Sequence, residues 1–105
     1  MNGSLVALPR PTIPADVQEF AAAKGVSHYL NAVIDLARQA FPSSALRVSL
    51  GQDAEDESHQ YIALDVEVGG RAAEELLAGQ RAWSAGVRRV CPSRDAVYFV
   101  LGWRS

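Results

Sequence analysis

The feature that most constrains this chain is a change of hydrophobic period around Pro42. Before Pro42, apolar residues recur at helical spacing in two runs, Val17 to Ala21 and Leu30 to Phe41. After it, Leu46, Val48 and Leu50 alternate with less apolar residues, and the same alternation returns in residues 62 to 68. A period of two is typical of a half-buried strand. The sequence therefore predicts two helices followed by two strands, most simply an antiparallel hairpin.

Proline, glycine and serine place the ends of the first two helices. Pro14 suits a first helical turn, where its missing N–H would be unpaired in any case. Gly25 is a natural stop for that helix, and Ser27 is expected to cap the second one. The second helix cannot continue through Pro42, which has no backbone N–H to donate. We expect a short helical hairpin.

The helical period returns between Arg71 and Val90. Gly79 and Gly86 lie one turn either side of Trp83 in the apolar stripe, and a helical glycine costs about 1 kcal/mol relative to alanine. We therefore expect a bulky or closely packed neighbour beside them. The whole stripe comprises Ala72, Leu76, Gly79, Trp83, Gly86 and Val90, broadened by Leu77 and Val87.

Residues 91 to 95 are predicted to form a loop, and residues 96 to 103 the last strand. One face of that strand would carry Val97, Phe99, Leu101 and Trp103, and the other Tyr98 and Val100.

This order, α-α-β-β-α-β, predicts an α+β fold with a three-stranded mixed sheet and the helices packed on one of its faces. The last crossover should be right-handed and leave the third strand parallel to the second. If Ser4 to Leu8 adds a fourth strand, the topology becomes a ferredoxin-like split β-α-β, which we keep as an alternative. Residues 13 to 105 are expected to form a single domain after an N-terminal arm, residues 1 to 12.

The composition of the chain bears on its location in the cell. No stretch approaches the roughly 20 apolar residues that a membrane helix needs, and no basic residue precedes the apolar patch near the N-terminus, so we expect neither a membrane segment nor a signal peptide. The single cysteine, Cys91, allows no intramolecular disulfide, which makes a cytoplasmic location the default. Residues 1 to 70 carry 4 basic and 9 acidic groups, whereas residues 71 to 105 carry 6 basic and 3 acidic groups. This split could steer a charged partner.

The acidic segment between the two predicted strands raises the question of a metal site. Its ligand set is incomplete, because a calcium loop of EF-hand type needs a glycine at its sharp turn and two flanking helices. A transition-metal site needs several imidazoles or thiolates, and His59 stands alone here. We expect a charged, solvated loop that binds no metal. Its ionisable residues are Asp53, Glu55, Asp56, Glu57 and His59.

The sequence offers no catalytic constellation. Cys91 would need a neighbouring base, and His28 and His59 fall on the second helix and in the acidic loop with no reason to converge on it. Glu74 and Glu75 are adjacent on a helix and so point in different directions. No nucleotide-binding, hydrolase or metalloprotease motif is present. We expect no enzymatic activity and no cofactor.

Two binding functions are left open. The helix-free face of the sheet should show both Tyr61 and Tyr98, and RNA-binding sheets stack bases on such aromatic residues. Asp65 and Glu67 share the face of Tyr61, however, and would repel phosphates. We therefore favour a non-catalytic module that binds another protein chain or itself, such as a subunit, an adaptor or an antitoxin-like inhibitor, with an RNA-binding sheet face as the alternative. The candidate interface residues are Tyr61, Tyr98, Val100, Trp103, Arg88, Arg89 and Arg94. For Trp103, a place in the core is weighed above a role as an exposed anchor.

Overall fold

The fold of the chain is seen in a computed structural model that describes residues 11–42, 44–56 and 58–104. Two helices, α1 (Ala15–Lys24) and α2 (Ser27–Ala40), precede the strands β1 (Leu46–Gln52) and β2 (Gln60–Glu67). A long helix, α3 (Ala73–Val90), and a short one, α4 (Ser93–Ala96), lead to the last strand, β3 (Phe99–Arg104). The predicted order of helices and strands is confirmed, and α4 lies where a loop was expected.

The chain turns sharply between α1 and α2. Gly25 has a φ of 72°, in the left-handed region that glycine adopts without penalty. Its N–H donates to the carbonyl of Ala22, and the next N–H, of Val26, donates to Ala21. Gly25 thus ends the helix as predicted. The expected cap is wrong, because Ser27 is already the first residue of α2 and no side chain caps that helix.

The three strands form one mixed sheet in the order β1, β2, β3. β1 and β2 are antiparallel, with Val48 opposite Leu64, and β2 and β3 are parallel, with Ile62 opposite Phe99. Both directions agree with the prediction. Residues 4 to 8, the alternative fourth strand, lie outside the described residues.

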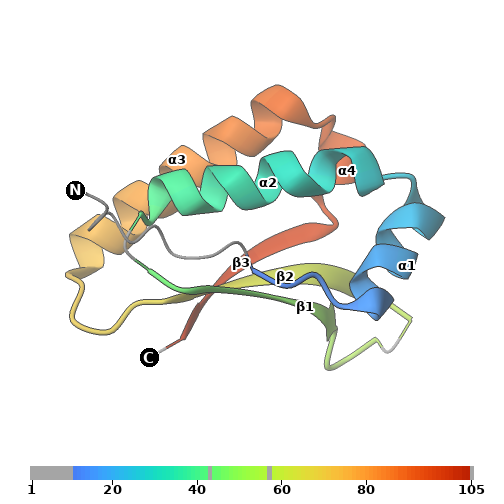
Figure 1. Cartoon of the computed structure of the whole chain (residues 1–105), viewed down its shortest axis with the longest axis horizontal. Coiled ribbons are helices and arrows are strands. Elements are labelled where there is room, and N and C mark those ends of the chain that lie inside the picture. The colour runs from blue at the N-terminus through green and yellow to red at the C-terminus, as the bar shows by residue number, and fades with distance from the viewer. Residues whose placement is uncertain (1–10, 43, 57, 105) are drawn as a thin grey trace, which may run out of the picture.

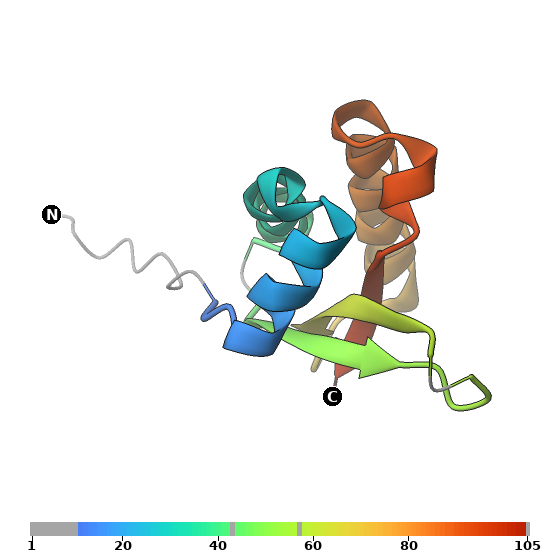
Figure 2. The ribbon, with the colours of Figure 1, turned by 90° about the vertical axis from the view of Figure 1, so that its right-hand side faces the viewer.

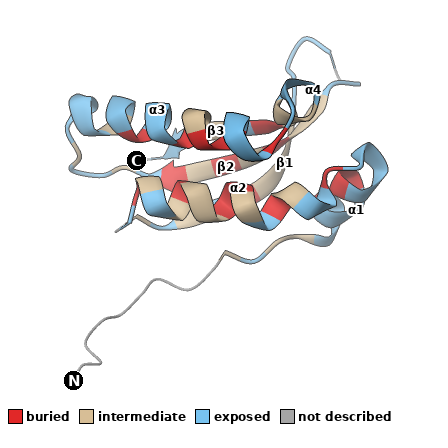
Figure 3. Ribbon diagram, turned by 90° about the horizontal axis from the view of Figure 1, so that it is seen from above, coloured by how far each residue is buried: buried red, intermediate tan, exposed pale blue. Residues whose placement is uncertain are grey.

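All the helices cover the same face of the sheet, and no described element covers the other (Figure 1). In Figure 2, α2 and α3 lie above the sheet and α1 lies beside the end of the β1–β2 hairpin. The core fills the space between the layers, as the buried residues on their inner sides show in Figure 3. Its fully buried large side chains are Val17, Val26, Val33, Ile34, Ile62, Leu64 and Val66.

The two glycines of α3 let that helix approach α2 closely. A Cβ atom at Gly79 would lie 2.5 Å from ring atoms of Phe41, and one at Gly86 would lie 2.6 Å from a methyl group of Leu36. Between them, the indole N–H of Trp83 donates to the carbonyl of Val33 over 3.3 Å. The prediction that bulky neighbours fill the room beside these glycines is confirmed.

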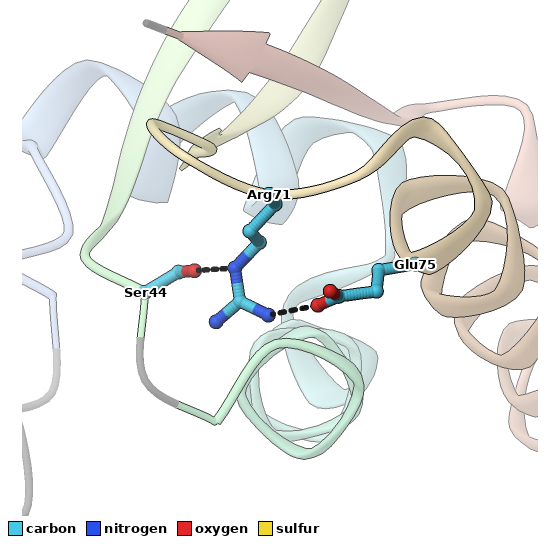
Figure 4. Close-up of polar contacts among 3 residues, drawn as sticks. All are labelled: Ser44, Arg71 and Glu75. Carbon is cyan, nitrogen blue, oxygen red and sulfur yellow. Dashed lines mark hydrogen bonds and ion pairs between the residues drawn. The ribbon is translucent and has the colours of Figure 1, made fainter.

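A polar contact fastens the beginning of α3 to the connection between α2 and β1 (Figure 4). The Nε of Arg71 donates to the hydroxyl of Ser44 over 3.0 Å, and its Nη1 lies 3.4 Å from a carboxylate oxygen of Glu75. Glu75 is exposed, so the ion pair contributes little, and the half-buried arginine acts mainly as a structural link.

Among the described residues, no helix is long and apolar enough to cross a lipid bilayer.

Candidate functional site

Two predicted interface residues, Tyr61 and Val100, lie on the uncovered face of the sheet. Tyr61 is opposite Gly51 in the register, and its ring lies across that glycine, where a Cβ atom would clash with it. Val100 is exposed beside Ala63 of the neighbouring strand. The apolar part of the uncovered face is therefore small and flat, because the Tyr61 ring lies across Gly51 and Val100 projects beside a short alanine side chain.

Charges of both signs occupy the other end of the uncovered face. Arg47 is opposite Asp65 on the neighbouring strand, and Glu67 is opposite Arg104. The carboxylate of Asp65 lies over Gly102, because a Cβ atom there would be 2.6 Å from its Oδ1. Two arginines and two carboxylates give this end no net charge, so it offers phosphates little attraction.

The ring of Tyr98 packs against α1, so the prediction that Tyr61 and Tyr98 both present their rings on the uncovered face is wrong. α4 and the turn after it delay the start of β3 to Phe99, so Tyr98 precedes the strand. Its ring meets that of Phe20 edge-on at 5.8 Å, and the Nζ of Lys24 lies 5.7 Å from the ring centre. Tyr98 therefore packs against α1. Val97, expected on the strand, is 61% exposed in the turn before it.

Trp103 lies on the helix-covered side of β3, but at the end of the strand. Its ring meets that of Phe41 edge-on at 5.5 Å, and 41% of the residue is exposed. Core burial, the favoured expectation, is not confirmed. The residue rests on the core and keeps an accessible surface.

The arginines of the candidate site lie at the end of α3 and in α4. Arg88, Arg89 and Arg94 are all exposed. Arg88 also lines a shallow hollow of ≈ 200 Å³, where α3 and α4 meet the start of β3. The other residues lining this hollow are Trp83, Ser84, Val87, Ala96 and Phe99.

The sequence interpretation missed the outer flank of α3, which Leu77, Arg81, Ser84 and Arg88 line. Leu77 was assigned to the buried stripe but is 50% exposed, and Val90 is also exposed. The signal was in the sequence, because these four residues follow each other at intervals of 4, 3 and 4 and so share one side of the helix. That side lies nearly opposite Gly79 and Gly86, which face α2.

The acidic loop makes its polar contacts within itself. Asp53 accepts the N–H of Glu55 over 2.8 Å, and Asp56 accepts both the N–H and the hydroxyl of Ser58, over 3.0 and 2.6 Å. The hydroxyl bond and then the backbone bond hold the pKa of Asp56 below its usual value. No group of three or more potential metal-ligating side chains is found among the described residues, which exclude Glu57.

Cys91 is buried, as predicted, with 3% of its surface exposed. Burial, and secondarily the nearby charge of Asp95, raise the pKa of its thiol. A neutral thiol is a poor nucleophile at neutral pH.

A larger hollow, of ≈ 620 Å³, lies between α1 and the end of the β1–β2 hairpin. Asp16, Glu19 and His59 contribute charged and titratable groups to it, and Tyr98 and Lys24 line it as well. Lys24 lies over the rings of Phe20 and Tyr98. The two carboxylates that line this hollow, Asp16 and Glu19, come from one exposed turn of α1, as is typical of a solvated surface.

The predicted interface residues are thus divided among three places: the uncovered face, the contact with α1, and the surface around β3 and the end of α3. No protein-family model, no curated protein and no solved structure significantly matches this chain.

Proposed function

We propose that this chain is a small non-catalytic module that binds another protein, as a subunit, an adaptor or an inhibitor. The observation that carries the proposal is the distribution of exposed apolar side chains. In the described part of the chain, every large exposed apolar residue comes from α3, β3 or the turn between them: Leu77, Val90, Val97, Val100 and Trp103.

This distribution is typical of an interface. Single exposed apolar residues are normal on any protein, but a group of them around one strand indicates a contact surface. Arginine and tryptophan are enriched in protein interfaces and in the residues that dominate their binding energy. The same region supplies 5 of the 10 basic residues of the chain. We place this activity in the cytoplasm, because the chain has a single, reduced cysteine.

RNA binding and catalysis receive less support. Tyr61 shares its sheet face with Asp65 and Glu67, and Tyr98 packs against α1, so the two aromatic residues do not form one stacking surface. The thiol of Cys91 is buried and its pKa is raised, which does not favour a nucleophilic role.

Site-specific photo-crosslinking in cells of the native host tests the proposal. A photoreactive amino acid replaces Leu77 or Val100 in the predicted contact surface, and Ala22 or Gln39, which are exposed on α1 and α2, in matched controls. We expect a discrete crosslinked protein adduct from the first two positions alone. No adduct from any position, or equal adducts from all four, would refute a protein-binding role for this surface.

A further inference from the structure

The helix layer extends beyond the edge of the sheet on the side of β3. Two packed helices span roughly 20 Å, whereas three strands span roughly 14 Å. α3 runs above β3, which is an edge strand (Figures 2 and 3). The outer flank of α3 therefore lies above space that a further strand would fill.

The backbone of β3 is available for such a strand. The N–H of Ile62 donates to the carbonyl of Tyr98 over 2.7 Å, and that of Val68 donates to Arg104 over 2.8 Å. Because peptide groups alternate in direction along a strand, the even-numbered residues of β3 face β2. The N–H and carbonyl groups of Phe99, Leu101 and Trp103 face outward.

Side chains that protect sheet edges are scarce on β3. Natural edge strands are commonly blunted by proline, by inward-pointing charges or by bulges. β3, with the sequence FVLGWR, has no proline, and its one charge is at its last residue, Arg104. The edge is open to pairing over most of its length.

The surface next to this edge has an apolar and a basic component. At one end, the hollow beside Phe99 offers a place for an apolar side chain. At the other end lie Trp103 and, above it on α3, Leu77, both partly exposed. Arg81 and Arg88 are exposed on the same flank of α3, and Arg104 ends the strand.

We propose that the edge of β3 and the outer flank of α3 bind an extended, acidic segment of a partner protein as a fourth strand. Apolar side chains of that segment pack beneath α3, between the hollow and Trp103. A carboxylate on the same side of the segment, between these apolar side chains, meets Arg81 and Arg88, and carboxylates on its other side face Arg104. Strand addition of this kind gains affinity from the backbone and specificity from alternate side chains. The inference rests on the protein-binding function proposed above and names the surface and the partner chemistry.

Charge selects this occupant over a second copy of the chain. Two copies that paired β3 with β3 across a two-fold axis would bring the same arginine flank against itself. Like charges at an interface cost binding energy, whereas an acidic segment is attracted.

The first test selects partners without assuming their identity. A phage-displayed library of random dodecapeptides is panned against the folded chain, and the most enriched peptide is synthesised. We expect peptides enriched in Asp and Glu, with apolar residues an even number of positions apart and at least one acidic residue on the same side of the strand as those apolar residues. No enrichment, or enrichment of basic or helix-period peptides, would overturn the proposal.

The second test locates the bound peptide. In NMR hydrogen-exchange measurements, the amides of Phe99, Leu101 and Trp103 should become protected when the selected peptide is added. Arg88→Glu should weaken binding about tenfold or more at low salt, whereas Arg47→Glu, the same charge change on the uncovered face, should have little effect. Strand addition at β3 would be contradicted by protection of amides outside β3 or by equal effects of the two variants. It would also be contradicted if the chain formed a concentration-dependent dimer in place of the peptide complex.

Protein binding at this surface and strand addition to β3 can be refuted separately. If crosslinking from Leu77 and Val100 yields no protein in the host, the binding function itself is wrong. If those adducts form but the β3 amides stay unprotected by the selected peptide, the surface binds protein and strand addition is wrong.

Discussion

Replacing Gly79 by alanine tests how tightly α3 packs against α2. An added Cβ would lie 2.5 Å from Cε1 and Cζ of Phe41, whereas carbon atoms in contact prefer about 3.5 to 4.0 Å. The Phe41 ring, which is 2% exposed and rests edge-on against Trp103, would have to move by about 1 Å. Overpacking of this kind costs about 1 to 3 kcal/mol, and alanine returns about 1 kcal/mol of helix propensity.

We therefore expect Gly79→Ala to lower the free energy of unfolding by about 1 kcal/mol, measured as a shift of the urea midpoint at unchanged slope. Gly79→Leu should lower it further. Gly86→Ala is the matched control, because the half-buried Leu36 that it meets can rotate away, so this variant should not destabilise the protein and should gain up to about 1 kcal/mol of helix propensity.

A double-mutant cycle separates overpacking from other causes. In a Phe41→Leu background the obstructing ring is gone, so Gly79→Ala should become stabilising by up to about 1 kcal/mol. If Gly79→Ala stabilises the unmodified protein, or has the same effect in both backgrounds, Phe41 does not obstruct a side chain at position 79.

Three further predictions concern chemistry and binding. Calcium, zinc or EDTA should leave the melting temperature unchanged, because the loop carboxylates bond within the loop; a rise of several degrees with one ion would contradict this. Cys91 should react slowly with a thiol reagent at neutral pH. Its raised pKa also makes the folded state hold the proton more tightly, so stability should fall as the pH rises above the ordinary thiol value, and Cys91→Ser should lose this dependence; rapid labelling would argue against the assignment. In filter binding, RNA should not be retained above background at physiological salt, whereas retention that Arg88→Ala and added salt both abolish would favour the RNA-binding alternative.

Hydrophobic period and turn residues sufficed to predict most of the fold. The positions of the helices and strands follow from local spacing, and Gly25 and Pro42 interrupt the helices because their backbones cannot continue them. The parallel β2–β3 pair follows from the helical crossover between them. Gly79 and Gly86 within the apolar stripe also predicted that a bulky neighbour packs closely against α3.

The candidate site was less predictable. Apolar alternation across residues 97 to 103 matched a strand, but the short helix α4 delays its start to Phe99, and Tyr98 then meets Phe20, a residue 78 positions earlier in the chain. A contact between residues so far apart leaves no local pattern. Leu77 was assigned to the apolar stripe although its spacing places it on the flank with Arg81 and Arg88, and whether that flank is covered depends on how many strands lie beneath α3.

The sequence by itself determined which segments are helices and strands, which side of each is apolar, and how the strands are directed, because these depend on residues a few positions apart. Only the tertiary structure decided which apolar side chains stay exposed. The helix layer is wider than the three-stranded sheet, so the overhanging flank of α3 and the edge of β3 remain uncovered, and this mismatch is a property of the packed layers that no single segment contains.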